Sequence, residues 1–476
     1  MTEKLIEYIS LINDRFLGYV LMAALVFCGT YFTLALRGVQ FARPKEFWKL
    51  ITERAGYSKQ KGNISSFQAF AISTASRVGT GNIAGVAIAI TVGGPGAIFW
   101  MWLIAVIGAA SAFAESTLAQ VYKVKKGTHF IGGPAFYMKD ALGKPWMGVT
   151  FSVIITLTFA FVFNSVQANT IAQSLQASFQ VSPAVTGGVL AFLTCAIIFG
   201  GLRRVAKFSA VIVPVFALGY IAVTLVVLAC NFEKIPAIFQ LIFTDAFSWQ
   251  NVAGGTLGAT VMTGARRGLF SNEAGMGSAP NAAATANISH PVRQGYVQAF
   301  SVFVDTLVIC SCTALIVLSA DYTALAGEGI TLTQQALGQT LGGAFSNGFI
   351  SASVLLFAFT SIIGNYYYGQ ANVQYLTHSR RVMVLFRTLV AGIVFLGSVA
   401  QLKLVWNLAD LFMTLMALLN ITAILMLRKQ VCAVLADYRA QKAKGIQNPQ
   451  FNPALVPEVR GAHAWENTPG ATGEKA

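Results

Sequence analysis

Charged residues are scarce in this chain, and their scarcity excludes most water-soluble folds. Only 11% of the 476 residues are Asp, Glu, Lys or Arg, whereas 55% are hydrophobic. Apolar runs of about 18 residues or more recur along the whole length, which is typical of an all-α polytopic membrane protein. The first run, 16–36, is too long for a signal peptide and is not followed by a small-residue cleavage site, so we expect it to be retained.

Cysteine and histidine are too few and too scattered to indicate a disulfide framework or a metal centre. The six cysteines fall almost entirely within apolar runs, and Cys310-Ser-Cys312 does not have metal-ligand spacing. None of the four histidines falls within an expected span. A membrane-embedded enzyme would need a nucleophile–base pair or a metal cluster at depth. We therefore expect no enzyme and no cofactor apart from a coupling ion.

Acidic residues are the rarer charges, which leaves a formal net charge of +15. Such a charge could indicate a nucleic-acid partner, but the Lys and Arg residues lie in short loops between apolar runs. There they set the orientation of the spans and face anionic lipid. We expect membrane lipid around the protein, no nucleic acid and no obligatory protein partner.

The apolar runs predict eleven spans, and the basic residues predict their orientation. Loops on one side hold 26 of the 33 Lys and Arg residues, which indicates an external N-terminus and a cytoplasmic C-terminus. If the first span is peripheral, the other ten form two sets of five with opposite orientations, which is an inverted repeat. The predicted spans are 16–36, 66–92, 96–121, 147–176, 184–201, 206–230, 251–284, 296–319, 346–376, 383–400 and 406–427.

These spans divide the chain into three predicted parts. Residues 1–65 hold the peripheral span and a basic cytoplasmic loop. Residues 66–427 form the core, with one repeat at about 66–230 and the other at about 251–427. The tail, 428–476, is basic and then rich in Pro, Gly and Asn, so we expect it to be cytoplasmic and largely disordered.

Two polar, glycine-rich stretches interrupt the apolar runs, one in each predicted repeat. In both, an arginine precedes an asparagine by five residues: Arg77 and Asn82, Arg267 and Asn272. Hydrocarbon offers such groups no hydrogen-bond partners, so we expect a broken helix at each stretch. Packing through a Gly-xxx-Gly motif is the alternative, but it leaves the polar residues unexplained.

A broken helix at mid-membrane supplies the groups that bind ions and substrates. The N-terminus of a half-helix presents free N–H groups to a carboxylate, and the C-terminus of the other presents carbonyls to Na⁺. Two breaks therefore favour a secondary transporter for a zwitterionic amino acid and a cation. A channel fits less well, because broken helices around a midplane site favour alternating access.

Four acidic residues lie within the expected spans. We predict that Glu115 and Glu273 accept hydrogen bonds from unwound backbone and balance nearby arginines, with a proton relay as the alternative. Asp410, near the start of a span, is expected to be structural, and the sequence assigns no role to Asp305.

The ninth span carries oxygen donors suited to Na⁺. Thr360 and Ser361 are adjacent hydroxyls, which either ligate Na⁺ or bond back to the preceding turn. The polar-aromatic cluster that begins at Asn365, one turn later, favours the first reading. On the fourth span, Gln167 lies one turn from Asn164, and both are expected to face a polar cavity.

Four stretches resemble the alanine/glycine:cation symporter family of bacterial sodium–amino acid carriers. They are SRVGTGNIAGVA, GGPGAIFWMW, FAESTLAQ and RRGLFSNEAGMGSAPNAAA, and the similarity runs from about Phe67 to Leu427. The resemblance implies the leucine-transporter type of fold in the bacterial inner membrane. It also implies uptake of a small neutral amino acid with Na⁺, alanine or glycine first. A Na⁺- or H⁺-coupled carrier of glutamine or another neutral amino acid is the alternative.

Carried over by position, the resemblance implies two sets of ligands and a brace at Glu115 for the second break. The implied sodium ligands are the carbonyls of Ala75, Val78 and Phe357 and the hydroxyls of Thr360 and Ser361. The implied substrate contacts are Thr80, Gly81, Asn82 and Phe270, with Gln167 nearby.

The same residues predict the size of the substrate. Gly79, Gly81 and Gly85 are expected to leave room for a ligand beside the backbone, and Phe270 to cap its side chain, which favours alanine, glycine or serine. Asn365 stands where some family members are expected to have tryptophan, and Gln370 where glutamate is common. A smaller residue with an amide at 365 would enlarge the site and admit glutamine.

Overall fold

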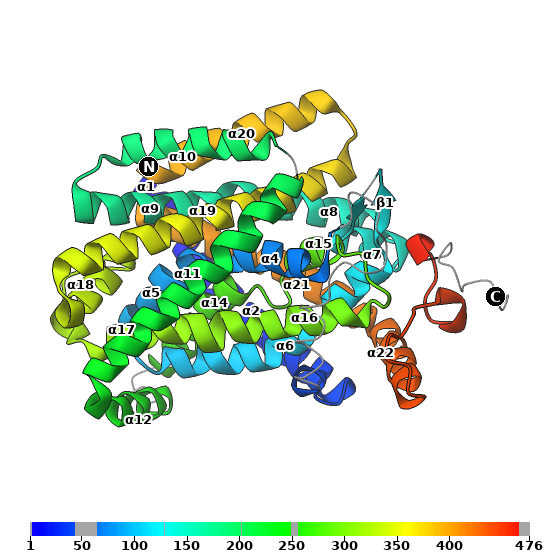
Figure 1. Ribbon diagram of the computed structural model, residues 1–476, viewed down its shortest axis with the longest axis horizontal. Coiled ribbons are helices and arrows are strands. Elements are labelled where there is room, and N and C mark those ends of the chain that lie inside the picture. Colours follow the sequence, from blue (N-terminus) through cyan, green and yellow to red (C-terminus); the bar gives the residue numbers. More distant parts are fainter. Residues whose placement is uncertain (1, 43–63, 128, 201, 249–255, 466–476) are drawn as a thin grey trace.

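Helices make up nearly all of the structure, as the apolar runs predict. The computed structural model describes residues 2–42, 64–127, 129–200, 202–248 and 256–465. Long helices run side by side along the longest axis of the molecule (Figure 1). The strands within the described residues are β1 (Val124–Lys126) and β2 (His129–Ile131), which form a short antiparallel hairpin. The all-α membrane fold class is confirmed.

Eight helices in the described residues are long and apolar enough to cross a membrane, or nine if the bent pair Ser66–Arg77 and Gly81–Gly93 is one span. Two predicted spans do not meet this test. The segment at 184–201 forms a helix of only 16 residues, and the segment at 251–284 is interrupted by polar backbone and begins outside the described residues. The count of eleven therefore stays a prediction, although each predicted span has a helical counterpart.

The helices have the following bounds: α1 Thr2–Ile12, α2 Gly18–Ala35, α4 Ser66–Arg77, α5 Val86–Gly93, α6 Ala97–Val121, α7 Pro134–Asp140, α8 Pro145–Ile155, α9 Asn164–Phe179, α10 Pro183–Ile198, α11 Leu202–Cys230, α12 Ile235–Ala246, α14 Thr256–Asn272, α15 Ala279–Ala283, α16 Val292–Phe303, α17 Ser311–Ser319, α18 Ile330–Leu341, α19 Gly343–Leu376, α20 Arg380–Val399, α21 Leu402–Met426 and α22 Arg428–Ala443. Short π-helical segments join several of these helices: Asn13–Leu17, Gly81–Gly85, Thr156–Phe163 and Val304–Cys310.

Two long helices organise the core. Helix α6 packs against α2, α14 and α16, and a run of small buried residues from Gly108 to Ala112 lets these helices approach closely. Helix α19 packs against α4, α9 and α11, while α10 and α20 lie together at one edge (Figure 1). Large side chains on α10, such as Phe192, are exposed, as expected for an edge that faces lipid.

The loops gather at two opposite ends of the molecule. Helices α12 and α18 lie at one end of the long axis, and β1, α7 and α22 lie at the other (Figure 1). We call these the α18 end and the α22 end. Helix α1 lies toward the α18 end, so the described chain begins and finishes at opposite ends. The charge bias predicts that the α22 end is cytoplasmic, and this orientation stays a prediction.

The tail differs from the predicted disorder. Arg428–Ala443 forms α22, and the chain then folds back so that Trp465 Nε1 donates a hydrogen bond to the backbone oxygen of Gln120, at 2.9 Å. The prediction was wrong for 428–465 because most of its apolar side chains are buried against the rest of the molecule, whereas Ile446 and Leu455 are exposed. The buried members are Val431, Val434, Leu435, Tyr438, Phe451, Val456, Val459, Ala462 and Trp465. Residues 466–476, and 43–63 of the basic loop, lie outside the described residues.

Candidate functional site

The first predicted helix break is present between α4 and α5. Helix α4 ends at Arg77, Val78 is extended (φ −75°, ψ 94°), and helix resumes at Gly81. The freed backbone is held by two side-chain amides. Gly79 N–H donates to Asn82 Oδ1 at 2.9 Å, and Thr80 N–H donates to Gln167 Oε1 at 3.0 Å. Gln167 thus reaches the break from α9, as predicted for a residue that faces the polar interior.

The second break, between α14 and α15, is longer than the first. Its backbone has positive φ at Glu273 (56°), Gly275 (80°) and Gly277 (85°), and glycine adopts this conformation without a steric penalty. The Glu115 carboxylate accepts hydrogen bonds from Gly275 N–H at 3.2 Å and Gly277 N–H at 3.0 Å. Asn420 Nδ2 donates to the same carboxylate at 2.7 Å and to the Gly275 oxygen at 2.9 Å. These hydrogen bonds let Glu115 hold the unwound backbone of the second break in place.

A buried polar cluster joins the two breaks. Ser76 Oγ, at the end of α4, lies 2.8 Å from Glu273 Oε1 and 2.7 Å from Asn365 Oδ1. A serine hydroxyl has one proton to donate. If it donates to Glu273, turning the Asn365 amide lets Nδ2 donate to Ser76, since the two amide ends are not distinguished by shape. Glu273 also accepts a hydrogen bond from Ser278 Oγ at 2.6 Å.

A second connection between the breaks passes through Asp305, to which the sequence assigned no role. Asn82 Nδ2 donates to Asp305 Oδ1 at 2.8 Å, and Ser271 Oγ donates to Asp305 Oδ2 at 2.7 Å. Thr306 Oγ1 donates to the same carboxylate at 3.1 Å. An acid within an apolar run was the available signal, but its neighbours come from distant segments, so the sequence could not identify them. Asn420 was missed for the same reason.

Four of the five predicted sodium ligands lie together. Ser361 Oγ is 3.2 Å from the Val78 carbonyl oxygen and 3.0 Å from the Phe357 carbonyl oxygen, and Thr360 Oγ1 is 2.8 Å from the same Phe357 oxygen. The fifth, Ala75, is buried on α4 one turn before the break. These are neutral oxygen donors, which suit a hard monovalent cation. The bonds within α19 also match the back-bonding alternative.

Aromatic rings cover the space beside the first break. Phe270 lies between Phe163 and Trp406, with ring centroids 4.6 Å and 4.8 Å away. A Cβ added to Gly81 would lie 2.9 Å from the Phe270 ring, and one added to Gly79 would collide with Ser361 Oγ. The room expected beside these glycines is therefore occupied by side chains in this structure, so a ligand there must displace them.

The arginines have partners other than the expected glutamates. Arg267 forms a buried ion pair with Asp410, and its guanidinium lies 4.6 Å from the Trp406 ring centroid. Arg77 donates to Ser301 Oγ and, at 3.4 Å, to Gln298 Oε1. The expected direct Glu–Arg contact is replaced because the glutamates are satisfied by backbone N–H groups and hydroxyls. Asp410 thus lies inside α21, which begins at Leu402, and pairs with Arg267 rather than serving as the helix-start residue that the sequence predicts.

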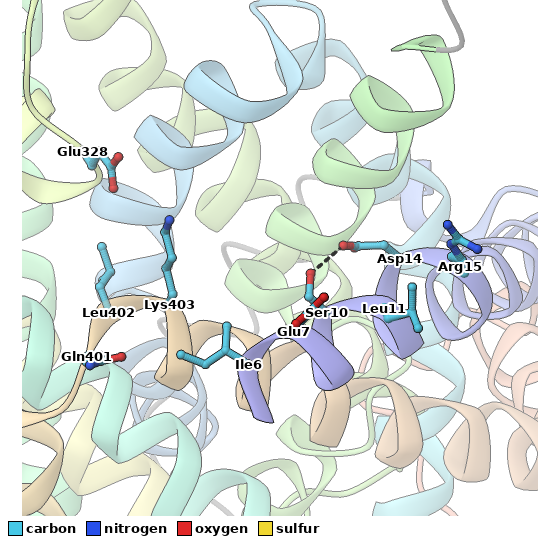
Figure 2. Close-up of a pocket in the computed structure, with 10 residues that line it drawn as sticks. All are labelled: Ile6, Glu7, Ser10, Leu11, Asp14, Arg15, Glu328, Gln401, Leu402 and Lys403. Carbon is cyan, nitrogen blue, oxygen red and sulfur yellow. Dashed lines mark hydrogen bonds between the residues drawn. The ribbon is translucent and has the colours of Figure 1, made fainter. Parts of the chain in front are cut away.

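Two adjoining cavities lead from the α18 end toward this ion pair. The outer one, about 780 Å³, lies between the N-terminal helix on one side and Glu328 and Lys403 on the other (Figure 2). In Figure 2 Ser10 hydrogen-bonds to Asp14 at its edge, at 2.9 Å. The inner cavity, about 490 Å³, shares Asp14, Glu328 and Lys403 and is lined by Arg267, Trp406 and Asp410. Trp406 and the ion pair therefore separate the cavities from Phe270 and the first break.

Comparison with known proteins identifies the family of the chain. The family model described as "Sodium:alanine symporter family" matches residues 2–453. The chain is 48% identical over 465 residues to "Probable sodium/glutamine symporter GlnT" of Bacillus subtilis, covering 97% of both chains. It is 46% identical to "Amino-acid carrier protein AlsT" of the same organism, covering 96% of this chain and 98% of that one.

Two further matches are more distant. "Sodium/alanine symporter AgcS" of Methanococcus maripaludis is 36% identical, covering 88% of this chain and 95% of that one. The crystal structure of MhsT in complex with L-phenylalanine superposes with a TM-score of 0.57 at 16% identity, covering 79% of this chain and 93% of that one. The latter likeness concerns the fold alone, which is that of a leucine-transporter-type protein.

Proposed function

Because the chain belongs to the sodium:alanine symporter family, we propose that it couples the inward movement of Na⁺ to uptake of a small neutral amino acid, with alanine or glycine preferred. At the level of the family, the function is sodium-coupled amino-acid symport by a multi-span membrane protein, not an enzyme. The preferred amino acid, the assignment of ligands and the orientation in the inner membrane are our proposals.

One observation carries the proposed coupling. The Ser361 hydroxyl lies 3.2 Å from the Val78 carbonyl, so an oxygen of α19 meets the unwound backbone at the first break. A Na⁺ ion held there by Val78, Phe357, Thr360 and Ser361 would fix α19 against the break. Because Gly79 and Thr80 follow Val78 directly, the same ion would shape the backbone that contacts the substrate. Binding of either species then favours binding of the other.

The first break supports recognition of an amino-acid carboxylate. Its N–H groups at Gly79 and Thr80 are held by neutral amide oxygens, and a carboxylate is a stronger acceptor than an amide. We propose that the substrate carboxylate takes the place of Gln167 Oε1 at Thr80 N–H. Phe270, which packs on Gly81, would cover a short side chain and clash with a long one.

Glutamine is the second candidate, and Asn365 favours it. This residue is 1% exposed and lies beside Ser76 at the first break, where it offers an amide to a polar substrate side chain. The relative named as a probable sodium/glutamine symporter is also among the more similar proteins. Whether the protein prefers alanine or glutamine would therefore depend on whether the substrate side chain reaches Asn365.

Transport would proceed by alternating access. The cavities at the α18 end stop at Trp406 and the Arg267–Asp410 pair, so opening toward that end requires these groups to separate from Phe270. At the α22 end, the chain around Ala286 lies beside the start of α4, and Trp465 of the tail bonds to Gln120. Asn287 N–H donates to the Ile64 oxygen at 3.0 Å, just before α4 begins.

Uptake of radiolabelled alanine into proteoliposomes tests this proposal. We expect uptake to require an inward Na⁺ gradient and not to be replaced by a K⁺ gradient. Competition by glycine and serine but not leucine would support the small site. If glutamine competes with alanine uptake in the wild type but not in Asn365→Trp, the result would favour glutamine as the substrate. Uptake driven equally well by a proton gradient without Na⁺ would contradict the proposal.

A further inference from the structure

A separate cavity of about 710 Å³ lies at the α22 end, away from both breaks. It is formed by the β1–β2 hairpin, α7, the start of α8 and the last turn of α19. Its lining combines lysines with aromatic and aliphatic side chains. The residues that matter for the argument are Lys125, Lys126, Lys139, Val149 and Tyr375. Nothing in the proposed transport mechanism uses this cavity.

The cavity is positively charged. Three of its lining side chains are lysines, and the carboxylate among them is Asp140, whose Oδ1 lies 3.8 Å from Lys139 Nζ. Lys125 and Lys139 are exposed, so their side chains can turn toward a ligand. Lysine binds phosphate as a compact point charge. The charge therefore favours an anionic ligand.

The cavity also adjoins an apolar surface on α8 and the segment that follows it. Trp146, Val149, Val153 and Leu157 are 63%, 46%, 45% and 36% exposed. Their spacing of three and four residues puts them on one face of the spanning segment Pro145–Phe179. An exposed apolar face on a membrane span contacts lipid. Val149 belongs to this face and to the cavity lining, so the charged and apolar surfaces are continuous.

The wall between the two surfaces is rigid. Tyr375 packs edge-on against Phe136, with ring centroids 5.1 Å apart. A Cβ added to Gly148 would lie 2.7 Å from the Ala135 carbonyl oxygen and 2.6 Å from Tyr375 Oη, so a glycine there lets α8 approach the backbone of α7 and the end of α19 this closely. The cavity is thus shaped before any ligand arrives, which reduces the entropy lost on binding.

We propose that this cavity binds the headgroup of an anionic phospholipid, with its phosphate among Lys125, Lys126 and Lys139 and an acyl chain along the face from Trp146 to Leu157. A soluble anion would use the lysines alone, whereas a lipid uses both surfaces. Basic pockets beside membrane helices recognise lipid headgroups in this way. Trp146 suits the boundary, because its ring is apolar and its N–H is polar.

The test uses the purified full-length chain and a triple variant, Lys125→Gln/Lys126→Gln/Lys139→Gln. The matched control, Lys429→Gln/Lys444→Gln/Arg460→Gln, removes three positive charges from exposed positions in the tail. Native mass spectrometry measures how much phosphatidylglycerol each protein retains after delipidation. Thermal unfolding measures protection by added phosphatidylglycerol, phosphatidylcholine or inorganic phosphate.

We expect the wild type and the control to retain phosphatidylglycerol and to gain thermal stability from it, while the triple variant binds it about tenfold more weakly. Phosphatidylcholine and inorganic phosphate should protect none of the three. Val149→Asn/Val153→Asn, which keeps the lysines, should also weaken lipid binding. Equal retention by the triple variant and the control would overturn the proposal. Protection by inorganic phosphate equal to that by the lipid would do so as well.

Discussion

The two helix breaks share a sequence pattern but are held by different chemistry. Two backbone N–H groups of the first break donate to the neutral amides of Asn82 and Gln167. Two N–H groups of the second donate to the carboxylate of Glu115. Hydrogen bonds to an ionised group are roughly twice as strong as neutral ones. We therefore expect the second break to be the more rigid one, and we propose that the first exchanges its partners for the substrate.

The largest expected effect follows from removing the Glu115 carboxylate. Glu115→Leu removes the acceptor of two buried backbone N–H groups and of one Asn420 N–H. Each buried donor left unpaired lowers the free energy of unfolding by about 1–3 kcal/mol. We expect no transport and a lower melting temperature. Glu115→Gln keeps one acceptor oxygen and should retain partial transport that still requires Na⁺. Uptake assays and thermal unfolding of both variants measure this difference.

The proton-relay alternative makes a different prediction for the same residue. If Glu115 carries a coupling proton, wild-type transport should be strongly driven by a pH gradient, and Glu115→Gln should lose that response. A wild type that responds to pH beside an unresponsive Gln variant would contradict a bracing role.

The next effect compares one glycine from each break. Gly277 has φ of 85°, and a Cβ there would lie 2.8 Å from both Asn420 and Phe151. Gly277→Ala should lower stability by about 2 kcal/mol or more, through backbone strain and overpacking. Gly81 is helical, and the atoms nearest to a Cβ added there belong to the Phe270 ring and the Ser271 backbone. Gly81→Ala should therefore keep the fold but raise the KM for alanine.

Thermal unfolding and alanine uptake of the two variants test this contrast. A Gly81→Ala protein that unfolds as easily as Gly277→Ala would mean that the first break is as rigid as the second. A Gly277→Ala protein with normal stability and a raised KM would reverse the assigned roles.

These contrasts show what the sequence could predict. A polar stretch within an apolar run located both breaks, because hydrocarbon excludes unpaired backbone. The same logic flagged Glu115 and Gln167. It could not pair Arg267 with Asp410, since those residues are 143 positions apart and a carboxylate at a helix start has many possible roles. Trp465 was missed because a few apolar residues in a polar tail resemble disorder until their common surface is known.

A smaller effect is expected from the oxygen donors on α19. Thr360→Ala/Ser361→Ala removes two proposed Na⁺ ligands, so the Na⁺ concentration for half-maximal uptake should rise about tenfold. Ser351→Ala, nearly three turns before Ser361 on α19, is the control and should leave the Na⁺ dependence unchanged, because Ser351 bonds to Ser174 instead. Unchanged Na⁺ dependence in the double variant would show that these hydroxyls only back-bond to their helix.

The smallest effect concerns the contact between His290, which follows the second break in the chain, and Asp437 of the tail. Burial lowers the pKa of His290 below its ordinary value of 6.5, although Asp437 Oδ2, 3.0 Å from Nε2, opposes the shift. The unfolded chain then binds this proton more readily than the folded one. Stability should therefore be complete above about pH 6.5 and fall as the pH drops below it.

Melting temperatures between about pH 5.5 and 8 measure this dependence. His290→Gln should flatten the acid side of the profile, whereas His378→Gln, at an exposed position, should leave it unchanged. An unaltered profile in His290→Gln would show that the tail contact does not contribute to the acid sensitivity.

The most direct test of the account is whether alanine can drive Na⁺ through the first break. Proteoliposomes with equal Na⁺ on both sides and no membrane potential are given an inward alanine gradient, and ²²Na⁺ influx is recorded. The account predicts alanine-driven Na⁺ accumulation in the wild type and slower accumulation in Thr360→Ala/Ser361→Ala at the same Na⁺ concentration. Alanine uptake without any ²²Na⁺ accumulation in the wild type would contradict it.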